Sequence, residues 1–446
     1  MLEKLLDRLA PTTRRLAAGT ALAAIAAAGF GAGTAQAQTL VTWDDYTDVG
    51  QNAVIEQLNK NFTAAHAGVT INRTARTFDD LSMTLKLTVA AGNGPEVTKV
   101  NQGAADQGTM VKQKLLVPID AYVKQYGWDK RLSDSVLARM RWSDTGQFGE
   151  GPTYGVSGLG EMVGLYYNQK VLSDAGISAP PKTFEELVAD ADTLKAKGVP
   201  AFVLGTAKQH IALHMLTGME QAHIDAPNRK ALDDLIYGRG GTFKTQADLD
   251  AATLMQKWAK GGYFNDGFQG VSGDDAVQIF VAGGGAFLLD GTWYFGDMQT
   301  NPDIHFMPVP APAGVSKPLT VGGIDLAWSI TTNAKDKASQ DLAAEYMDYM
   351  ISPEAANAWA AAGFFPSTTP TDQSAIKSSL LKEGLAMWKV LGDNNALGHY
   401  ADWASPTLLK TYDDNMPHLL AGDLTPQAFV DALDADYQAY MKSIGK

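Results

Sequence analysis

Residues 153–200 have the sequence TYGVSGLGEMVGLYYNQKVLSDAGISAPPKTFEELVADADTLKAKGVP, and this stretch decides the fold. The glycines at 155–160 predict a flexible connection, and the apolar, aromatic run at 163–167 predicts a β-strand. Thr183 precedes Glu186 by three residues, which is the spacing of a capping box, and the apolar residues after it recur on one helical face. The stretch therefore predicts a hinge, a strand and a helix in that order.

Strands and helices also alternate on both sides of this stretch. Val54, Ile55, Leu58 and Phe62, for example, recur at helical spacing between two expected strands. Such alternation predicts α/β structure with mostly parallel strands, whose ligands bind beyond the carboxyl ends of the strands. Further strands are expected at 40–43, from 69, at 96–100, 201–204 and 320–330, and helices at 78–91, 209–221, 246–260 and 338–350.

Four phrases in the central stretch resemble the signature of bacterial extracellular solute-binding proteins. They are Tyr-Gly at 154–155, Leu-Tyr-Tyr-Asn at 165–168, Ala-Gly-Ile at 175–177 and Pro-Pro-Lys-Thr-Phe-Glu-Glu-Leu at 180–187. More narrowly, the chain resembles the maltose-binding-protein-like members of family 1, the sugar-binding components of ABC importers.

Several motifs outside that stretch extend the resemblance over nearly all of the chain after residue 37. Residues 280–293 resemble the family's Phe-x-x-Gly-x-Ala-Ala-Met-x-x-x-Gly-x-Trp, with Leu288 in place of the methionine, and 363–366 resemble its Gly-x-x-Pro turn. Two positions depart from the family pattern. Glu96 replaces the usual aspartate of Pro-Asp-Val, and Lys114 stands where a glycine is common.

The resemblance implies an α/β, two-lobed periplasmic-binding-protein fold of type II-like topology, with a ligand cleft between lobes joined by hinge crossovers. The crossovers are expected near 154–161, 282–287 and 317–323. The expected division is a signal peptide at 1–37, a first lobe of 38–155 plus 284–320, and a second lobe of 156–283 plus 321–446.

Composition restricts the classes of partner. The chain of 446 residues carries a formal net charge of -13 and has no run rich in lysine and arginine, so no nucleic-acid partner is expected. Cysteine is absent, which excludes disulfides, thiolate metal sites and a lipidated cysteine. We expect no cofactor and a monomer.

The first 37 residues have the features of an export signal. Arg14 and Arg15 precede an alanine-rich apolar stretch, and 35–37 supply a small-x-small pattern before cleavage near Ala37. The apolar stretch is short for a membrane anchor, which is the alternative. We therefore expect a periplasmic protein without a lipid anchor, exported by the Sec or the twin-arginine route.

Aromatic side chains and carboxylates occur together at the predicted strand ends. Aromatic rings offer flat apolar area to the C–H faces of a sugar, and carboxylates and amides bind its hydroxyl groups. Each tryptophan is alternatively a core residue, and each carboxylate a solvated loop residue. The candidate ligand-binding residues are Trp43, Asp44, Asp45, Tyr46, Asn101, Glu161, Asp290, Trp293, Gly323, Asp325, Trp328, Phe364 and Trp403.

Motifs for catalysis or metal binding are weak. His210 and His214 share a helix face at i, i+4 but no accompanying glutamate motif completes a zinc site, so no metal is expected. The glycines and the serine at 155–160 form neither a GxSxG elbow nor a dinucleotide-binding loop, so no catalytic residue is expected.

The predicted function is an exported binding protein that captures a mono- or oligosaccharide and delivers it to an ABC import permease, its expected membrane partner. The alternatives are a binding protein for a polyamine or a glycerol phosphodiester, and an extracellular glycoside hydrolase. The sequence leaves open which sugar is bound, its length and anomer, the identity of the permease, and which aromatic residues face the cleft.

Overall fold

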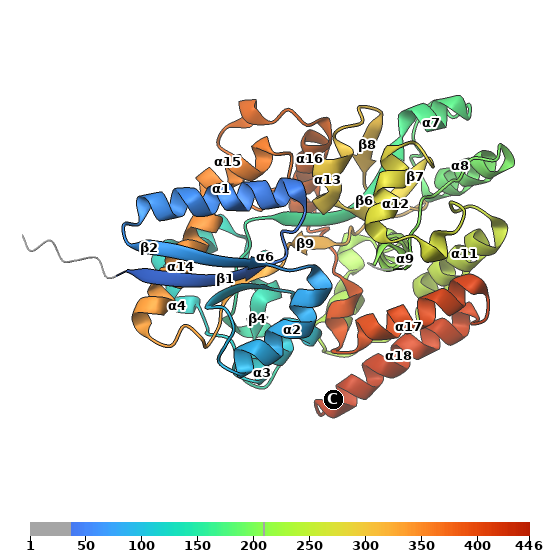
Figure 1. The fold of residues 1–446 in the computed structure, drawn as a ribbon. Coiled ribbons are helices and arrows are strands. Elements are labelled where there is room, and N and C mark those ends of the chain that lie inside the picture. The colour runs from blue at the N-terminus through green and yellow to red at the C-terminus, as the bar shows by residue number, and fades with distance from the viewer. Residues whose placement is uncertain (1–36, 208–209) are drawn as a thin grey trace, which may run out of the picture. The chain divides into compact units, whose positions relative to one another are not determined.

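A computed structural model describes residues 37–207 and 210–446 (Figure 1). The expected signal peptide therefore lies outside the described residues, except for Ala37. None of the helices within the described ranges is both long and apolar enough to span a membrane.

The first sheet has the strand order β10-β3-β1-β2. The central strand β1 (Gln38–Asp44) is parallel to β2 (Val69–Ala75) and to β3 (Val97–Val100), as the alternation of elements predicts. A fourth strand, β10 (Ala327–Ile330), joins the edge antiparallel to β3. The first three expected strands are confirmed, and they leave their carboxyl ends at a common edge.

Two helices connect the strands of this sheet. Figure 1 shows α1 (Val49–Ala65) running alongside β1 and β2, and α2 (Phe78–Ala90) leads into β3. The expected apolar face of α1 is confirmed, because the residues at that spacing are buried: Val54, Ile55, Leu58 and Phe62.

The second sheet is organised around β6 (Gly160–Asn168), the strand of the central stretch. Its partners β7 (Phe287–Gly291), β8 (Ile304–Met307) and β9 (Gly322–Ile324) are all antiparallel to it. The expectation of mostly parallel strands is therefore wrong for this sheet. A short antiparallel pair, β4 (Arg141–Trp142) and β5 (Phe148–Thr153), precedes it.

The helix predicted after the double proline is α8 (Phe184–Ala196). The Thr183 hydroxyl accepts a hydrogen bond from the Glu186 N–H at 3.2 Å, so the predicted cap is present. The Glu186 carboxylate accepts from the Lys182 N–H, one residue earlier than in a capping box. The strand expected at 201–204 is absent; Phe202 makes only isolated bridges, to Phe264 and Phe287.

The remaining α-helices pack around the two sheets. They are α3 (Thr109–Lys112), α4 (Asp120–Tyr126), α5 (Trp128–Arg131), α6 (Asp134–Leu137), α7 (Gln169–Asp174), α9 (Ile211–Ala222), α10 (Lys230–Ile236), α11 (Gln246–Gly261), α12 (Gly273–Val281), α13 (Phe295–Met298), α14 (Lys337–Met350), α15 (Pro353–Ala361), α16 (Ser379–Asp393), α17 (Leu408–Ala421) and α18 (Pro426–Ser443). The helices expected at 246–260 and 338–350 are thus confirmed as α11 and α14. The helix expected at 209–221 is present as α9, and its residue 209 lies outside the described ranges.

Three connecting segments lie side by side between the two sheets. The first, 154–159, leads from the β4–β5 pair into β6, and the second, 325–326, leads from β9 to β10. A third segment, 362–366, contacts the first, because the Gly160 N–H donates to the Phe365 carbonyl at 2.9 Å and Leu159 bridges Pro366. Gly160 also pairs with Ile324 of β9.

The strand pairing groups the chain differently from the expected lobe division. The strands β7 and β8, expected in the first lobe, pair with β6, which was expected in the second. The strand β10, expected in the second lobe, pairs with β3 of the first. A motif gives a strand its order along the chain, but the pairing partner depends on contacts between distant segments. The segment 282–287 accordingly leads into β7 on the β6 sheet rather than across to the first sheet.

Candidate functional site

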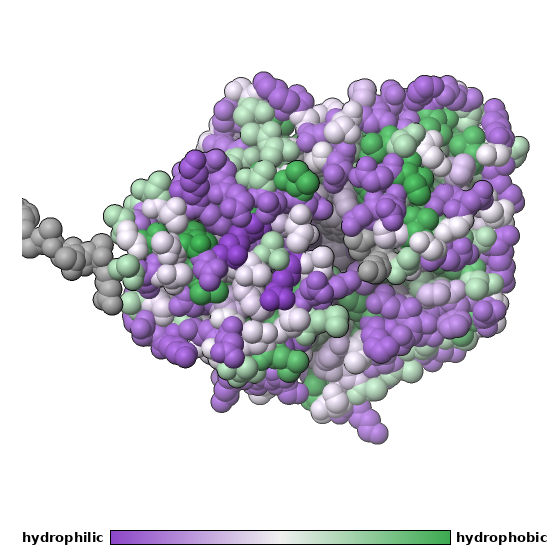
Figure 2. Space-filling model, in the orientation of Figure 1, coloured by the Kyte–Doolittle hydropathy of each residue, from purple (hydrophilic) through white to green (hydrophobic). Residues whose placement is uncertain are grey.

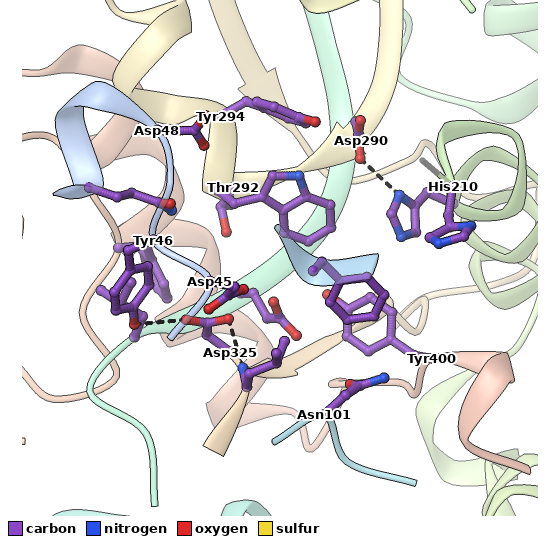
Figure 3. A pocket seen from close by; sticks show the side chains of 18 of the residues that line it. Asp45, Tyr46, Asp48, Asn101, His210, Asp290, Thr292, Tyr294, Asp325 and Tyr400 are labelled. Atoms are coloured by element: carbon purple, nitrogen blue, oxygen red, sulfur yellow. Dashed lines mark hydrogen bonds and ion pairs between the residues drawn. The ribbon is translucent and has the colours of Figure 1, made fainter. Parts of the chain in front are cut away.

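A cavity of about 270 Å³ lies beside the connecting segments and the ends of β1, β3 and β7 (Figure 3). Figure 2 shows the surface hollowed near the middle of the view, with many hydrophilic side chains around the hollow. Nine of the thirteen expected ligand-binding residues line this cavity: Asp45, Tyr46, Asn101, Glu161, Asp290, Trp293, Asp325, Phe364 and Trp403.

A buried lysine organises the carboxylates on one side of the cavity. The Lys99 side chain, on β3, is 0% exposed; its ammonium lies 2.7 Å from Asp45 and also pairs with Asp325. The Tyr46 hydroxyl donates to the Asp325 carboxylate at 3.0 Å, and the Lys99 ammonium lies 3.7 Å from the centre of the Tyr46 ring. Figure 3 shows Tyr46 and Asp325 pointing toward each other. Segments 226 residues apart in the chain are thereby fixed around one charge.

Burial and the paired carboxylates act in opposite directions on Lys99. Burial lowers the pKa of the ammonium, but Asp325 and Asp45 outweigh it and the pKa of Lys99 is raised. Burial likewise raises the pKa of Asp325, and Lys99 opposes that rise. The lysine therefore stays charged and holds both carboxylates in place.

The opposite side of the cavity is built by the end of β7. Asp290 is 1% exposed, and its carboxylate lies 2.9 Å from Nδ1 of His214 on α9. The His214 ring packs against the partly exposed Trp293 ring, with 5.1 Å between centroids. At Gly291 a Cβ atom would lie 2.0 Å from the Trp293 ring, so only glycine allows this ring position. The Tyr294 hydroxyl donates to Asp274 at 3.0 Å.

Two further carboxyl groups of the cavity have raised pKa values. Burial, together with the charges of Asp325 and Asp45, raises the pKa of Glu161 well above its ordinary value, against the opposing effects of Lys99 and Tyr400. Burial also raises the pKa of Asp402. A carboxyl group with a raised pKa offers a hydroxyl donor as well as an acceptor.

Two expected residues at the end of β1 lie outside the cavity. Trp43 is 8% exposed and its ring is covered by the Arg76 guanidinium at 4.0 Å. Asp44 is fully buried and pairs with Arg73 at 2.6 Å. Side chains alternate between the faces of a strand, so the spacing that brings Asp45 toward Lys99 directs Asp44 elsewhere.

The other two expected residues outside the cavity belong to β9 and β10. Trp328 is 1% exposed in the core, where its ring packs edge-on against Tyr46 and Tyr346. Gly323 pairs with Glu161 in the β6–β9 ladder, and a Cβ atom there would lie 2.9 Å from the Arg139 guanidinium. Trp328 supports the cavity wall from behind rather than forming it.

Other residues of the cavity were not singled out as ligand-binding from the sequence. Asp402 and Tyr294 adjoin the predicted tryptophans 403 and 293, so proximity to a candidate was the available signal. His214 of α9 had been considered, with His210, only as a metal ligand, and the other lining residues of α9 and α2 carried no signal in the sequence. The additional lining residues are Thr47, Asp48, Gln51, Thr77, Phe78, Leu159, Gly160, His210, Ile211, Leu213, His214, Asp274, Thr292, Tyr294, Leu326, Phe365, Tyr400, Asp402 and Leu409.

His214 of α9 and His210, which directly precedes the helix, have separate carboxylate partners. His210 Nδ1 lies 3.3 Å from Asp413, and His214 Nδ1 lies 2.9 Å from Asp290. Among the described residues, no group of three or more histidine, aspartate or glutamate side chains could hold a metal ion.

Comparison with known proteins places this geometry in a family. Residues 46–357 match the sequence model described as bacterial extracellular solute-binding protein. The chain belongs to this family. A putative binding protein of Brucella abortus is 23% identical over 63% of this chain, and the match spans only 65% of that relative's length. The maltooligosaccharide ABC transporter solute-binding lipoprotein of Streptococcus pneumoniae is 26% identical, over 69% of this chain and 68% of that protein.

Solved structures of other solute-binding proteins share the fold. A chitin oligosaccharide binding protein superposes with a TM-score of 0.79 at 21% identity, covering 91% of this chain and 99% of the other. The predicted two-lobed α/β fold of a solute-binding protein is therefore confirmed. The relatives and structural neighbours of this solute-binding protein are binding proteins rather than enzymes.

Replacing Glu161 with glutamine is expected to stabilise the protein in a pH-dependent way. Because the folded pKa of Glu161 is raised above 4.5, the folded chain retains a proton that the unfolded chain releases, and wild-type stability falls as the pH rises past that value. Glutamine carries no such proton. The variant should gain stability over the wild type at about pH 8 and not at about pH 4, measured by urea unfolding. An equal difference at both pH values would contradict the burial of this carboxyl group.

Proposed function

We propose that this protein binds a mono- or oligosaccharide in the 270 Å³ cavity and delivers it to an ABC import permease. The observation that carries the proposal is the Trp293 ring, partly exposed at the cavity wall beside the fixed His214–Asp290 pair. An aromatic plane next to an oriented carboxylate matches the C–H face and the hydroxyl groups of a sugar. The name of the streptococcal relative and that of the structural neighbour both refer to oligosaccharides.

The charges of the cavity support a neutral ligand. Seven carboxyl groups line the cavity, and its described lining residues include no lysine or arginine. A glycerol phosphodiester is disfavoured, because its phosphate would need such a cationic partner. Part of this negative charge is compensated. Asp45 and Asp325 share the ammonium of Lys99, and burial favours the neutral form of Glu161. These carboxyl groups are held in place as oriented hydrogen-bonding groups for the hydroxyls of a sugar.

The binding cycle follows from the two sheets. We infer that one lobe is built on the β10-β3-β1-β2 sheet and the other on the β6 sheet. The connecting segments 154–159, 325–326 and 362–366 then act as the hinge, and a sugar that contacts both lobes stabilises the closed form by its differential affinity. The closed form docks on the permease and releases the sugar unchanged. We further propose that the chain is exported to the periplasm and acts as a monomer.

A polyamine is the second candidate ligand. The observation in its favour is the acidic loop after β1, where Asp48 lines the cavity, and burial together with Asp297 and Asp274 raises the pKa of Asp48. The ammonium groups of a diamine would offset the repulsion among these carboxylates.

A ligand screen tests the function. The chain from Gln38 onward is purified and melted with mono-, di- and oligosaccharides, putrescine and glycerol phosphates. A ligand at about 100 times its dissociation constant stabilises the fold by about 2.7 kcal/mol. A shift with one class of sugar, and chromatographic recovery of that sugar intact, is the expected result. A shift only with putrescine or a glycerol phosphate would show that the ligand is not a sugar. Turnover of the sugar would show that the protein is a hydrolase rather than a binding protein.

A further inference from the structure

A second cavity, of about 410 Å³, shares none of its lining residues with the first. It is formed where the segment around α6, the helix α10 and the end of α16 meet. Its lining residues are Ser133, Ser135, Val136, Arg139, Arg229, Asp233, Tyr237, Trp388, Leu391, Gly392, Asn395, Leu397 and His399.

An arginine without an acidic partner lies in this cavity. Arg139 is 2% exposed, and its guanidinium donates to the carbonyl oxygens of Gly322 at 2.6 Å and Leu397 at 3.4 Å. Its Nε has no hydrogen-bond partner, and no carboxylate of the described residues forms an ion pair with it. The guanidinium also lies 5.7 Å from the centre of the Trp403 ring. A buried charge normally requires a counter-charge, and neither carbonyl groups nor an aromatic ring supply one.

The other charged groups of the cavity do not neutralise Arg139. The single lining carboxylate, Asp233, is already held by Arg229 at 2.9 Å and by His399 at 2.7 Å. Burial, together with the nearby Arg139 charge, lowers the pKa of His399 to about 3, so its ring is neutral at physiological pH. Two guanidinium groups face one carboxylate, which leaves one positive charge uncompensated. The His399 Nδ1 is also buried without a partner.

We propose that this cavity binds a small oxyanion, a phosphate or carboxylate group, with Arg139 as the principal donor. A guanidinium group presents N–H donors in a plane that matches two oxygens of such a group. Uncompensated positive charge is unusual in this protein, because the chain has a formal net charge of -13 and the first cavity is lined by acids. A positively charged cavity is therefore local to these residues rather than a property of the whole surface. The proposal is independent of the ligand of the first cavity.

Calorimetric titration of the chain from Gln38 onward with inorganic phosphate and with citrate tests the proposal. Sodium chloride keeps the ionic strength constant in every titration. We expect one ion bound per chain, and the better of the two ligands shows whether phosphate or carboxylate groups are preferred. Arg139→Gln should weaken binding about tenfold or more, because it removes the unpaired charge.

Two further variants make the result specific. Ser135 is exposed at the cavity, so Ser135→Glu adds a negative charge there without disturbing the core and should also weaken binding. Ser135→Glu alone tests the proposal if Arg139→Gln does not fold. The matched control is Arg239→Gln, which removes a guanidinium that is 41% exposed, pairs with Glu150 and lies outside the cavity, and should leave affinity unchanged. Absence of saturable binding to wild type, or equal affinity in Ser135→Glu and Arg239→Gln, would overturn the proposal.

Discussion

Replacing Lys99 with methionine is expected to lower the free energy of unfolding by about 3–5 kcal/mol, the usual cost of removing one partner of a buried ion pair. Methionine keeps much of the length of the side chain but removes the ammonium that Asp45 and Asp325 share. Both carboxylates are then left close together without a counter-charge. Urea unfolding near neutral pH measures the effect through the shift in midpoint.

Lys170→Met is the matched control for this substitution. Lys170 is 63% exposed and pairs with Asp174 across one helical turn, so its loss should leave the free energy of unfolding nearly unchanged. The second substitution in Lys99→Met/Asp325→Asn removes one of the two unpaired carboxylates and should restore part of the lost stability. If Lys99→Met and Lys170→Met lower the free energy of unfolding by similar amounts, the buried cluster of Lys99, Asp45 and Asp325 does not stabilise the fold as expected.

The second large effect is expected on binding. Trp293→Ala should reduce affinity for the sugar found in the ligand screen by about 2–3 kcal/mol, typical for removal of an aromatic residue at the centre of a binding site. Stability should change much less, because the ring is partly exposed at the cavity wall. Isothermal titration gives the affinity, and thermal melting of the same sample reports the fold.

Glycine variants test whether the position of the Trp293 ring matters, and not only its presence. Gly291→Ala places a methyl group 2.0 Å from that ring and should displace it, lowering affinity while the indole remains. Gly270→Ala is the control, because a Cβ atom at Gly270 meets no atom within 4 Å. Unchanged affinity in Gly291→Ala would mean that the Trp293 ring does not contact the sugar.

Local patterns in the sequence predicted local structure well. The apolar spacing of α1, the Thr183 cap of α8 and the strand β6 each depend on residues within a few positions of one another. A long ordered motif could likewise indicate the family, because its phrases keep their order along the chain. The motif at 280–293 also contains Asp290 and Trp293, two of the candidate ligand-binding residues, and both line the cavity.

Strand partners and side-chain direction were decided by the tertiary structure. The alternation of helices and strands did not reveal that β7 and β8 pair antiparallel with β6, or that β10 joins β3. Trp328 was a candidate ligand-binding residue in the sequence, as Trp293 was, yet it is buried in the core.

The sequence by itself determined the family resemblance, most of the helices and strands, and the kinds of side chain that gather at strand ends. Only the tertiary structure showed that Lys99 joins Asp45 to Asp325, and that Arg139 is buried without an acidic partner. Helices and strands follow from interactions between near neighbours in the chain. The charge around a buried group depends instead on residues that only folding brings together, as the separation of 226 residues between Lys99 and Asp325 illustrates.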